Sequence, residues 1–425
     1  MKSKSPMPAG CPLASARRSL RLNLCGLVLA VASSGLAENW PSWRGPRGDG
    51  TSLETGVPVK WSATENVIWK TELPGIGHAA PIVWGDRVFT VTALPESLER
   101  VLLCLDRKTG KILWQKTVLT SPLEKKHREN SYASGTPATD GQKVFVAFLD
   151  DTSIVVAAYD FTGKPLWSVK PGTFASQWGF ASSPQLFEDK LIIDCDSKDE
   201  NFLAALSIAD GHTLWKTKRP NPSQSYATPL IRKMAGRDQI IQPGGNSVSS
   251  YDPKDGSCLW TVDGKFSDYL ASPAYSEKAG LVLASSSWPG RILVAVRPGG
   301  SGNVTTTQVA WSTEEGAPYV PAPVAAGGYF LTSAMDKAVC FEAATGKVLW
   351  KQEIGLCHAS PVVANGAVYF LNDEGVMNVV KPGPAFELIS RNELGEKTYA
   401  QPAISQGQVF IRGFTHLYCI GAAAK

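Results

Sequence analysis

The chain has 425 residues, 43% hydrophobic and 19% charged, and its 42 basic and 38 acidic residues give a formal net charge of +4. The first 37 positions hold five basic residues and no acid, so the remainder has 37 basic residues against 38 acidic ones. A chain so close to neutral lacks the basic surface that binds nucleic acids or acidic lipids, and we expect neither kind of partner.

The N-terminal segment has the features of an export signal. Its basic residues precede the apolar run LNLCGLVLAVASSGLA, which ends in small residues. That run is short for a bilayer-spanning helix, and Cys25 inside it does not make a lipoprotein box. We predict a signal peptide over residues 1–37, cleaved near Ala37, and a periplasmic or secreted mature chain without a membrane span. A retained membrane anchor is the alternative.

The stretch NWPSWRGPRGDGTS, Asn39 to Ser52, follows the signal and is rich in tryptophan, arginine and glycine. It has no counterpart in the repeats that fill the rest of the chain. We therefore predict that residues 38–66 form a non-repeating strap across one face or the rim of the fold, with Trp40, Trp43 and Trp61 docked on it. In the alternative, this segment is an arm that covers a ligand funnel, with Arg44 as an anion contact.

A repeat occupies the chain from about residue 67 onward. The units TGKILW, TGKPLW and TGKVLW recur with weaker copies, and their tryptophans are Trp114, Trp167, Trp215, Trp260, Trp311 and Trp350. Separations near 45 residues are typical of four-stranded propeller blades. Within one unit, short β-rich runs such as AVYFLN and VMNVVK are bounded by turn residues. We expect the repeated tryptophan to wedge against the neighbouring blade.

Eight first strands can be counted, from HAAPIV to YAQPAI, and the last blade lacks a fourth strand. The orphan segment VIWKTEL, Val67 to Leu73, resembles the missing strand, with Trp69 in the repeat position. The sequence therefore predicts an all-β fold, an eight-bladed β-propeller of four-stranded antiparallel blades over residues 67–421, with a tail at 422–425. The N-terminal strand completes the C-terminal blade and so closes the ring.

One aromatic residue or histidine stands just before each first strand, where the chain crosses from one blade to the next. These eight side chains should surround a central funnel: His78, Tyr132, Trp178, Tyr226, Tyr269, Tyr319, His358 and Tyr399. A ring of π-faces with polar tips suits a flat or sugar-like ligand, or a loop of a partner protein. In the alternative interpretation, the ring plugs the channel or wedges the blades apart.

Other chemical signals are sparse. Of the six cysteines beyond the signal, Cys104, Cys340 and Cys419 share one repeat position, and we expect mostly buried free thiols. The carboxylate cluster DCDSKDEN, Asp194 to Asn201, lacks the pattern of a calcium-binding hand loop, and a solvated hairpin is the better interpretation. We find no metalloprotease histidine pair, no nucleophile elbow and no phosphate-binding glycine loop. The sequence thus predicts no metal site and identifies no catalytic residue.

At units such as DRKTGKILW and EAATGKVLW the sequence resembles the pyrroloquinoline-quinone (PQQ) repeat superfamily over nearly the whole mature chain. Two branches of that superfamily set the expectations. Quinoprotein dehydrogenases hold PQQ with calcium in the funnel and use a disulfide of adjacent cysteines, whereas this chain has no Cys-Cys pair and no haem-attachment motif. BamB-type scaffold proteins have the same propeller and no cofactor. Only Trp178 resembles the tryptophan floor of the dehydrogenases. No residues of this chain can be matched to their calcium ligands or to their catalytic aspartate, so we assign neither role here.

The resemblance and the residues together favour a non-enzymatic binding or scaffold propeller, monomeric and without a cofactor. Its expected partner is an envelope or extracellular protein, or a small-molecule ligand at the aromatic funnel or rim. One alternative is a PQQ-dependent alcohol or sugar dehydrogenase that uses PQQ and calcium. Another is a carbohydrate-binding propeller, because the faces of tyrosine and tryptophan stack on sugars.

Overall fold

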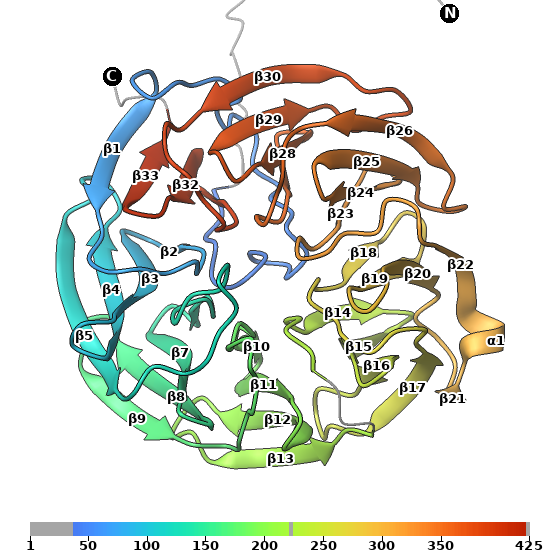
Figure 1. Cartoon of the computed structure of the whole chain (residues 1–425), viewed down its shortest axis with the longest axis horizontal. Coiled ribbons are helices and arrows are strands. Elements are labelled where there is room, and N and C mark those ends of the chain that lie inside the picture. The colour runs from blue at the N-terminus through green and yellow to red at the C-terminus, as the bar shows by residue number, and fades with distance from the viewer. Residues whose placement is uncertain (1–36, 221–223, 422–425) are drawn as a thin grey trace, which may run out of the picture. The chain divides into compact units, whose positions relative to one another are not determined.

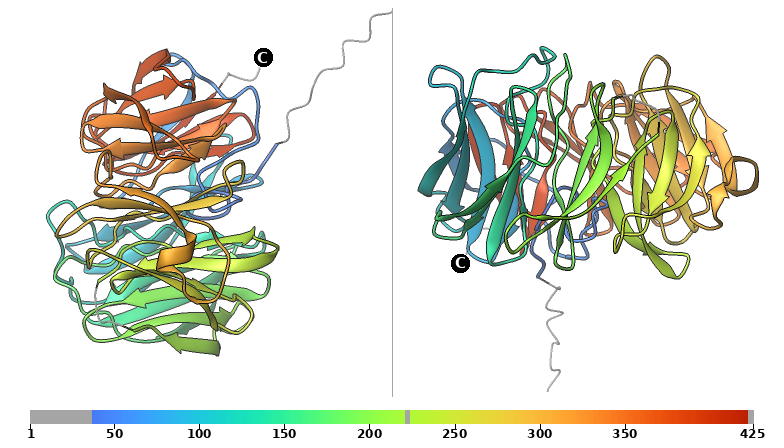
Figure 2. Two further views of the ribbon diagram at one scale, coloured as in Figure 1. Left: turned by 90° about the vertical axis from the view of Figure 1, so that its right-hand side faces the viewer. Right: turned by 90° about the horizontal axis from the view of Figure 1, so that it is seen from below.

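Eight sheets stand as blades around a central axis (Figure 1) in the computed structural model. The structure describes residues 37–220 and 224–421. The expected signal peptide up to residue 36 and the expected tail at 422–425 lie outside these residues. Figure 2 shows the same ring of blades from two further directions. The described part of the chain holds no helix with the length and hydrophobicity that a membrane crossing requires.

The first four blades follow one another along the chain, each running from its innermost to its outermost strand. Blade 1 contains β2 (Ile82–Trp84), β3 (Arg87–Leu94), β4 (Glu99–Asp106) and β5 (Ile112–Thr120). Blade 2 contains β6 (Ala138–Thr139), β7 (Lys143–Asp150), β8 (Ser153–Asp160) and β9 (Pro165–Val169). Blade 3 contains β10 (Gln185–Phe187), β11 (Lys190–Asp196), β12 (Asn201–Ser207) and β13 (Thr213–Lys218). Blade 4 contains β14 (Leu230–Met234), β15 (Arg237–Gly244), β16 (Ser247–Tyr251) and β17 (Cys258–Asp263).

The next three blades keep this order, with one local addition. Blade 5 contains β18 (Ala274–Ser276), β19 (Leu281–Ser286), β20 (Ile292–Val296) and β22 (Val309–Thr313). Before its last strand come β21 (Gly302–Asn303), which pairs in parallel with the edge of blade 4, and the short helix α1 (Thr305–Gln308). Blade 6 contains β23 (Val324–Ala326), β24 (Tyr329–Ala334), β25 (Lys337–Glu342) and β26 (Val348–Glu353). Blade 7 contains β27 (Val362–Ala364), β28 (Ala367–Leu371), β29 (Val376–Val380) and β30 (Leu388–Glu393).

The eighth blade joins the two ends of the described chain. It contains β31 (Ala403–Ser405), β32 (Gln408–Arg412), β33 (His416–Ile420) and, outermost, β1 (Val67–Glu72). The strand β1 runs antiparallel to β33, with Trp69 opposite Cys419. The predicted eight-bladed, four-stranded antiparallel propeller and its closure by the N-terminal strand are therefore confirmed. Closure pairs two edges that would otherwise be open to other chains.

Seven of the eight outer strands carry the repeated tryptophan, β30 of blade 7 being the exception, and most of these rings contact a turn of the following blade. Six of these indoles donate their N–H to a backbone carbonyl there; Trp69, for example, donates to Arg107 O at 2.8 Å. A Cβ atom on Gly110, at φ +72°, would lie 2.6 Å from the Trp69 ring, so this turn needs a glycine. Trp260 departs from the pattern and donates to Gln239 Oε1 of its own blade.

Residues 38–66 cross the centre of the ring rather than its outer rim (Figure 1). The backbone of Trp40 pairs with Val83 of β2, and that of Thr51 pairs in parallel with Val363 of β27. The segment then follows blade 7 outward, where Trp61 N donates to Asn392 Oδ1 at 2.9 Å. We call residues 38–66 the strap. It ties blade 1 to blade 7 across the central axis before the chain enters β1.

Arg44 anchors the strap from inside the fold. Its guanidinium is fully buried and donates to Pro361 O at 2.7 Å, to Pro323 O at 2.6 Å and to Gln401 Oε1 at 3.0 Å. Burial lowers the pKa of Arg44 to about 10, against the effect of Asp49. A Cβ atom on Gly50 would lie 2.5 Å from this guanidinium. Because its side chain is fully buried and both Nη groups already donate to oxygens of the protein, Arg44 is not placed to be the anion contact of the alternative interpretation.

The acidic hairpin of blade 3 is buried, and the expectation of a solvated cluster is wrong for its first half. Asp194 and Asp196 are 1% and 0% exposed and face blade 4. Asp196 accepts from Arg219 Nε at 2.8 Å, while neither carboxyl oxygen of Asp194 has a hydrogen-bond partner in the described residues. Strand alternation puts both on the face opposite Cys195, which sequence composition does not reveal. All six described cysteines are free thiols and all but Cys258 are buried, as predicted.

Candidate functional site

A central pocket of about 680 Å³ opens among the connections that lead from one blade to the next. Its volume lies within the range of small-molecule sites. Six of the eight predicted ring residues line it, namely His78, Trp178, Tyr226, Tyr319, His358 and Tyr399. The position before each first strand therefore does lie around the centre of the ring. A role of these residues in binding stays a prediction.

Tyr132 and Tyr269 do not line the pocket. Tyr269 is 3% exposed and packs in the apolar core between blades 4 and 5. Tyr132 packs on the core between blades 1 and 2, with the Lys126 ammonium 5.1 Å from its ring centre. Both are farther along the chain from the following proline than His78 is. Distance from the proline does not explain their placement, because Trp178 is farther still from its proline and lines the pocket.

His358 is held by carboxylates on two sides. Its backbone N–H and its Nδ1 both lie 2.8 Å from the Asp373 carboxylate, and its Nε2 lies 3.6 Å from Glu129 Oε2. Burial by itself lowers the pKa of His358, but Asp373 and then Glu129 outweigh burial and leave the pKa raised. An imidazolium is therefore favoured here, and the pocket contains a cation that its own neighbours already neutralise.

The neighbouring histidine has the opposite character. His78 lies 5.0 Å from Tyr399 and 5.3 Å from Phe414, measured between ring centres. Burial, together with the charge of Arg412, lowers the pKa of His78 to about 3, so this ring is neutral. Tyr399 also stacks on His358 at 4.2 Å. On this wall of the pocket, which we call the histidine wall, the aromatic faces are occupied by one another.

Three other aromatic side chains at the pocket are open to solvent. Trp178 is 41% exposed, Trp288 59% and Tyr319 37%. The backbone carbonyl of Trp178 is fixed by Asn130 Nδ2 at 2.8 Å, and the backbone of Trp288 pairs with Asp268. We call these three side chains the tryptophan wall. Large exposed aromatic groups around a concave site mark binding surfaces more often than they mark packing.

Sequence reasoning missed Trp288 because this residue does not precede a first strand. It lies between β19 and β20, in the hairpin SSWPG, where an apolar ring followed by Pro-Gly was a usable signal. Glu129 and Asp268 were missed as well, since neither belongs to a repeat position. Long connections between blades, such as residues 121–137, were the available signal for such groups.

Gln224 points a free amide at the pocket. Its side chain is 4% exposed and lines the pocket, and its Nε2 has no hydrogen-bond partner among the described residues. A buried amide without a partner costs about 1–3 kcal/mol. Unpaired donors of this kind are expected where a ligand supplies the missing acceptor.

The inner end of the pocket is a belt of hydroxyl groups. Each first strand has a proline near its start, and the residue before that proline occupies an equivalent position in every blade. In five pairs of neighbouring blades, the backbone N–H at this position donates to the side-chain hydroxyl at the equivalent position of the next blade, at 2.9–3.0 Å. The acceptors, which we call the hydroxyl belt, are Thr136, Ser183, Thr228, Ser272 and Ser360. Trp43 of the strap also lines the pocket and donates its indole N–H to Ser272 Oγ at 3.2 Å. The belt and the strap therefore support the pocket from beneath.

Comparison with known families identifies the repeat. The profile of the family described as outer membrane protein assembly factor BamB matches residues 53–131, 98–287 and 274–381, more than half of the chain. The chain belongs to this PQQ-repeat β-propeller family. Family membership accounts for the repeat and the blades, but the pocket-lining residues have to be judged one by one.

Curated relatives of this family member are enzymes. A polyvinylalcohol dehydrogenase from Pseudomonas sp is 28% identical over 209 residues, 45% of this chain and 30% of the relative. Quinohemoprotein alcohol dehydrogenase ADH IIB from Pseudomonas putida is 26% identical over 293 residues, 63% of this chain and 42% of the relative. The chain thus matches less than half the length of either protein.

Solved structures confirm the fold alone. BamB from Moraxella catarrhalis has a TM-score of 0.59 at 17% identity, and covers 83% of this chain and 99% of its own. A europium-containing methanol dehydrogenase has a TM-score of 0.56 at 11% identity, and covers 91% of this chain and 98% of its own. A scaffold protein and an oxidoreductase are therefore similar to this propeller to about the same degree, and the fold does not choose between them.

Proposed function

We propose that this chain is a non-enzymatic binding propeller that acts outside the cytoplasm and holds its ligand in the central pocket. The ligand is a small molecule or a loop of an envelope or extracellular protein. The observation that carries the proposal is the tryptophan wall. Trp178, Trp288 and Tyr319 expose aromatic surface at the mouth of a supported pocket, and the buried Gln224 amide lacks a partner. Such surface is unfavourable in water unless a ligand covers it.

The enzymatic alternative is a PQQ-dependent dehydrogenase, which the names of the curated relatives favour. PQQ is a flat tricarboxylate, so a site for it requires cations that are free to pair with its carboxylates. In this pocket, His358 already lies between Asp373 and Glu129, and the described lining residues include no arginine and one lysine, Lys198, which is too few cations for three carboxylates. The pocket residues do not fit this cofactor.

The metal that accompanies the quinone meets a similar difficulty. Calcium takes six to eight oxygen ligands, several of them from carboxylates. Among residues 37–220 and 224–421, no group of three or more histidine, cysteine, aspartate or glutamate side chains is arranged to hold a metal ion. We therefore derive no redox step for this chain and retain the binding role.

Two measurements on the purified mature chain test this proposal. The first incubates the protein with PQQ and calcium and then assays dye-linked oxidation of ethanol, glucose and polyvinyl alcohol; we expect no turnover. The second compares thermal shifts of the wild type and Trp178→Ala across libraries of small molecules, oligosaccharides and peptides. We expect stabilising compounds whose effect is lost in the variant and kept in Leu388→Ala, an exposed change on the outer strand β30.

Either of two results would overturn the proposal. One is recovery of a stoichiometric quinone together with oxidation that Trp178→Ala abolishes. The other is the absence of any compound whose stabilising effect depends on the pocket. Because Trp178 is 41% exposed, its truncation should leave the unfolding midpoint of the free protein nearly unchanged, so a lost ligand effect reports on the pocket itself.

A further inference from the structure

We infer that the ligand of the central pocket is a neutral oligosaccharide, bound across the tryptophan wall. This inference rests on the binding function proposed above and narrows it to one chemical class. It combines three properties of the pocket: free aromatic faces, hydrogen-bonding groups of both kinds, and histidines that already lie against carboxylates.

The free aromatic faces are confined to one wall. On the histidine wall, Tyr399 stacks on His358 at 4.2 Å and meets His78 at 5.0 Å, so these rings cover one another. Within the described residues, Trp288 and Tyr319 make no ring contact, whereas the Trp178 ring meets His127 edge-on, with 5.6 Å between ring centres. Their open faces present the negative side of a π-system. The C–H groups on one face of a pyranose ring are weakly positive and apolar, and they complement such a surface.

The polar groups suit a ligand whose edge both donates and accepts hydrogen bonds. The carboxylates of Glu129 and Asp268 line the pocket as acceptors, and Gln224 Nε2 is a buried donor without a partner. A hydroxyl group offers one donor and two acceptor positions. Adjacent sugar hydroxyls can therefore satisfy a carboxylate and an amide at the same time, which a purely anionic ligand cannot do.

The charges argue against an anionic ligand. His127 Nδ1 lies 3.7 Å from Glu129, and His358 Nε2 lies 3.6 Å from the same carboxylate. Lys198 also lines the pocket, together with the two carboxylates Glu129 and Asp268, and its charge opposes the rise in the pKa of Asp268 that burial causes. Phosphates and polycarboxylates require cations with unused capacity, usually arginine. A neutral polyhydroxylated ligand needs none, and about 680 Å³ has room for a short oligosaccharide.

The experiment is a glycan array followed by isothermal titration with the best neutral hit, alongside cellohexaose, maltohexaose, chitohexaose and an anionic oligogalacturonate. We expect saturable binding of a neutral oligosaccharide that weakens at least tenfold in Trp178→Ala and in Trp288→Ala. Trp288→Phe, which keeps an aromatic face, should lose less affinity than Trp288→Ala. Leu388→Ala, a matched truncation of an exposed apolar side chain, should stay within twofold of the wild type.

The charge of Asp268 allows a test that separates a neutral ligand from an anionic one. Asp268→Asn keeps the shape of the side chain but removes its negative charge. For a neutral sugar, this change should weaken binding severalfold, because a charge-assisted hydrogen bond from a hydroxyl is lost. For an anionic ligand the same change should strengthen binding, because a like charge is removed. Stronger binding of the array hit to Asp268→Asn would overturn the inference.

Failure of this inference can be told apart from failure of the proposed function. If no glycan binds, but a peptide or another small molecule stabilises the wild type and not Trp178→Ala, the binding function stands and the sugar assignment is wrong. Tight binding of oligogalacturonate alone would have the same meaning. If PQQ supports oxidation, or if no compound depends on the pocket, both proposals fall. Binding of a neutral glycan that both tryptophan substitutions leave unchanged would likewise refute the proposed site.

Discussion

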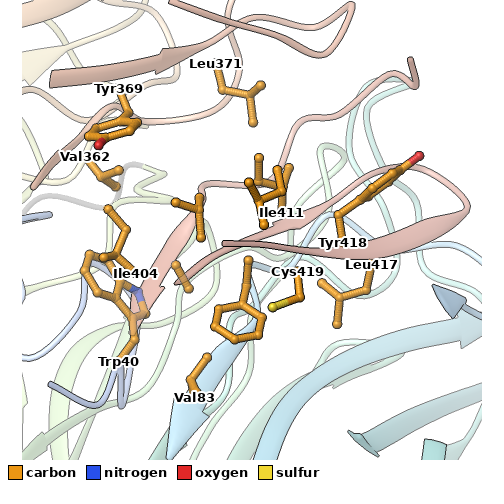
Figure 3. Close-up of a cluster of buried hydrophobic side chains, with 14 of the residues drawn as sticks. Trp40, Val83, Val362, Tyr369, Leu371, Ile404, Ile411, Leu417, Tyr418 and Cys419 are labelled. Atoms are coloured by element: carbon orange, nitrogen blue, oxygen red, sulfur yellow. The ribbon is translucent and has the colours of Figure 1, made fainter. Parts of the chain in front are cut away.

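Two interfaces between neighbouring blades differ in how they are held. The closure interface, where the strap and β1 meet blades 1, 7 and 8, is an apolar cluster that extends from Trp40 to Ile420 (Figure 3). The interface between blades 3 and 4 contains a small apolar group and, beside it, the buried ion pair of Asp196 with Arg219 and the buried Asp194, whose oxygens have no hydrogen-bond partner among the described residues. We call the second one the polar interface.

The difference shows two ways of joining blades. Apolar contact is non-directional and grows with the area removed from water, at about 25 cal/mol per Å², so it tolerates the non-repeating strap. A buried ion pair contributes little net stability, but it fails severely when one partner is lost. We therefore expect substitutions in the closure interface to lower stability in proportion to the apolar area that they remove. In the polar interface, we expect the loss of a single charged group to lower stability strongly.

The largest effect is expected for Arg219→Ala. This change leaves Asp196 buried without its partner, and it also removes the hydrogen bond from Arg219 Nη1 to Tyr251 at 2.8 Å. We expect a loss of about 3–5 kcal/mol in the free energy of unfolding, measured by denaturant titration. The exposed neighbour Lys218→Ala serves as the control and should change little. Equal effects of the two variants would show that the polar interface is not sensitive to single groups.

Trp40→Ala tests the closure interface. The ring is fully buried between blades 8 and 1 and the strap, but its Nε1 has no hydrogen-bond partner in the described residues. Removal of an unpaired donor offsets part of the cavity penalty, so we expect a loss of about 3 kcal/mol, the low end for a large aromatic residue. The measurement is again denaturant unfolding. A loss larger than that of Arg219→Ala would reverse the comparison.

Asp194→Asn should stabilise the protein at neutral pH. Burial, and then the charge of Asp196, raise the pKa of Asp194 well above 3.8. Above pH 3.8 the unfolded chain has lost this proton while the folded chain keeps it, so stability falls as the pH rises toward the folded pKa. The asparagine variant cannot ionise, so it should be more stable than the wild type at pH 8, and the difference in the free energy of unfolding should be smaller at pH 4.

Thermal unfolding between pH 4 and pH 8 checks this prediction. The control is Asp199→Asn, an exposed carboxylate in the same hairpin, which should leave the pH dependence unchanged. An Asp194→Asn variant whose pH profile is parallel to that of the wild type would contradict a protonated Asp194.

The smallest effect is expected from the hydroxyl belt. Ser183→Ala removes the acceptor of the buried Thr136 N–H at 2.9 Å, next to the polar interface, and should lose about 1–2 kcal/mol. Near the closure interface, the residues that precede the first-strand proline are Gln401 and Ala80, and neither carries a hydroxyl group. Ala80→Ser should therefore raise the free energy of unfolding by much less than Ser183→Ala lowers it. Unfolding midpoints of the two variants measure this difference, and equal and opposite shifts would show that the belt matters equally around the ring.

Part of the site followed from the sequence. The rule of one aromatic group before each first strand correctly placed His78, Trp178 and His358 around the axis. The rule failed at Tyr132 and Tyr269, whose side chains pack on the apolar cores between blades, a packing that only the folded chain decides. Glu129 and Trp288 belong to no repeat, so only the folded chain brings them to the pocket.

The sequence by itself determined the blades, their number and their closure. These features depend on local signals that recur from blade to blade, namely turn residues, strand patterns and a tryptophan in the outer strand of every blade but the seventh. Tertiary structure alone decided that Arg44 is buried, that Asp194 faces blade 4, and that the tryptophan and histidine walls share one pocket. Such facts depend on residues far apart in the chain, whose distances are set only when the ring has closed.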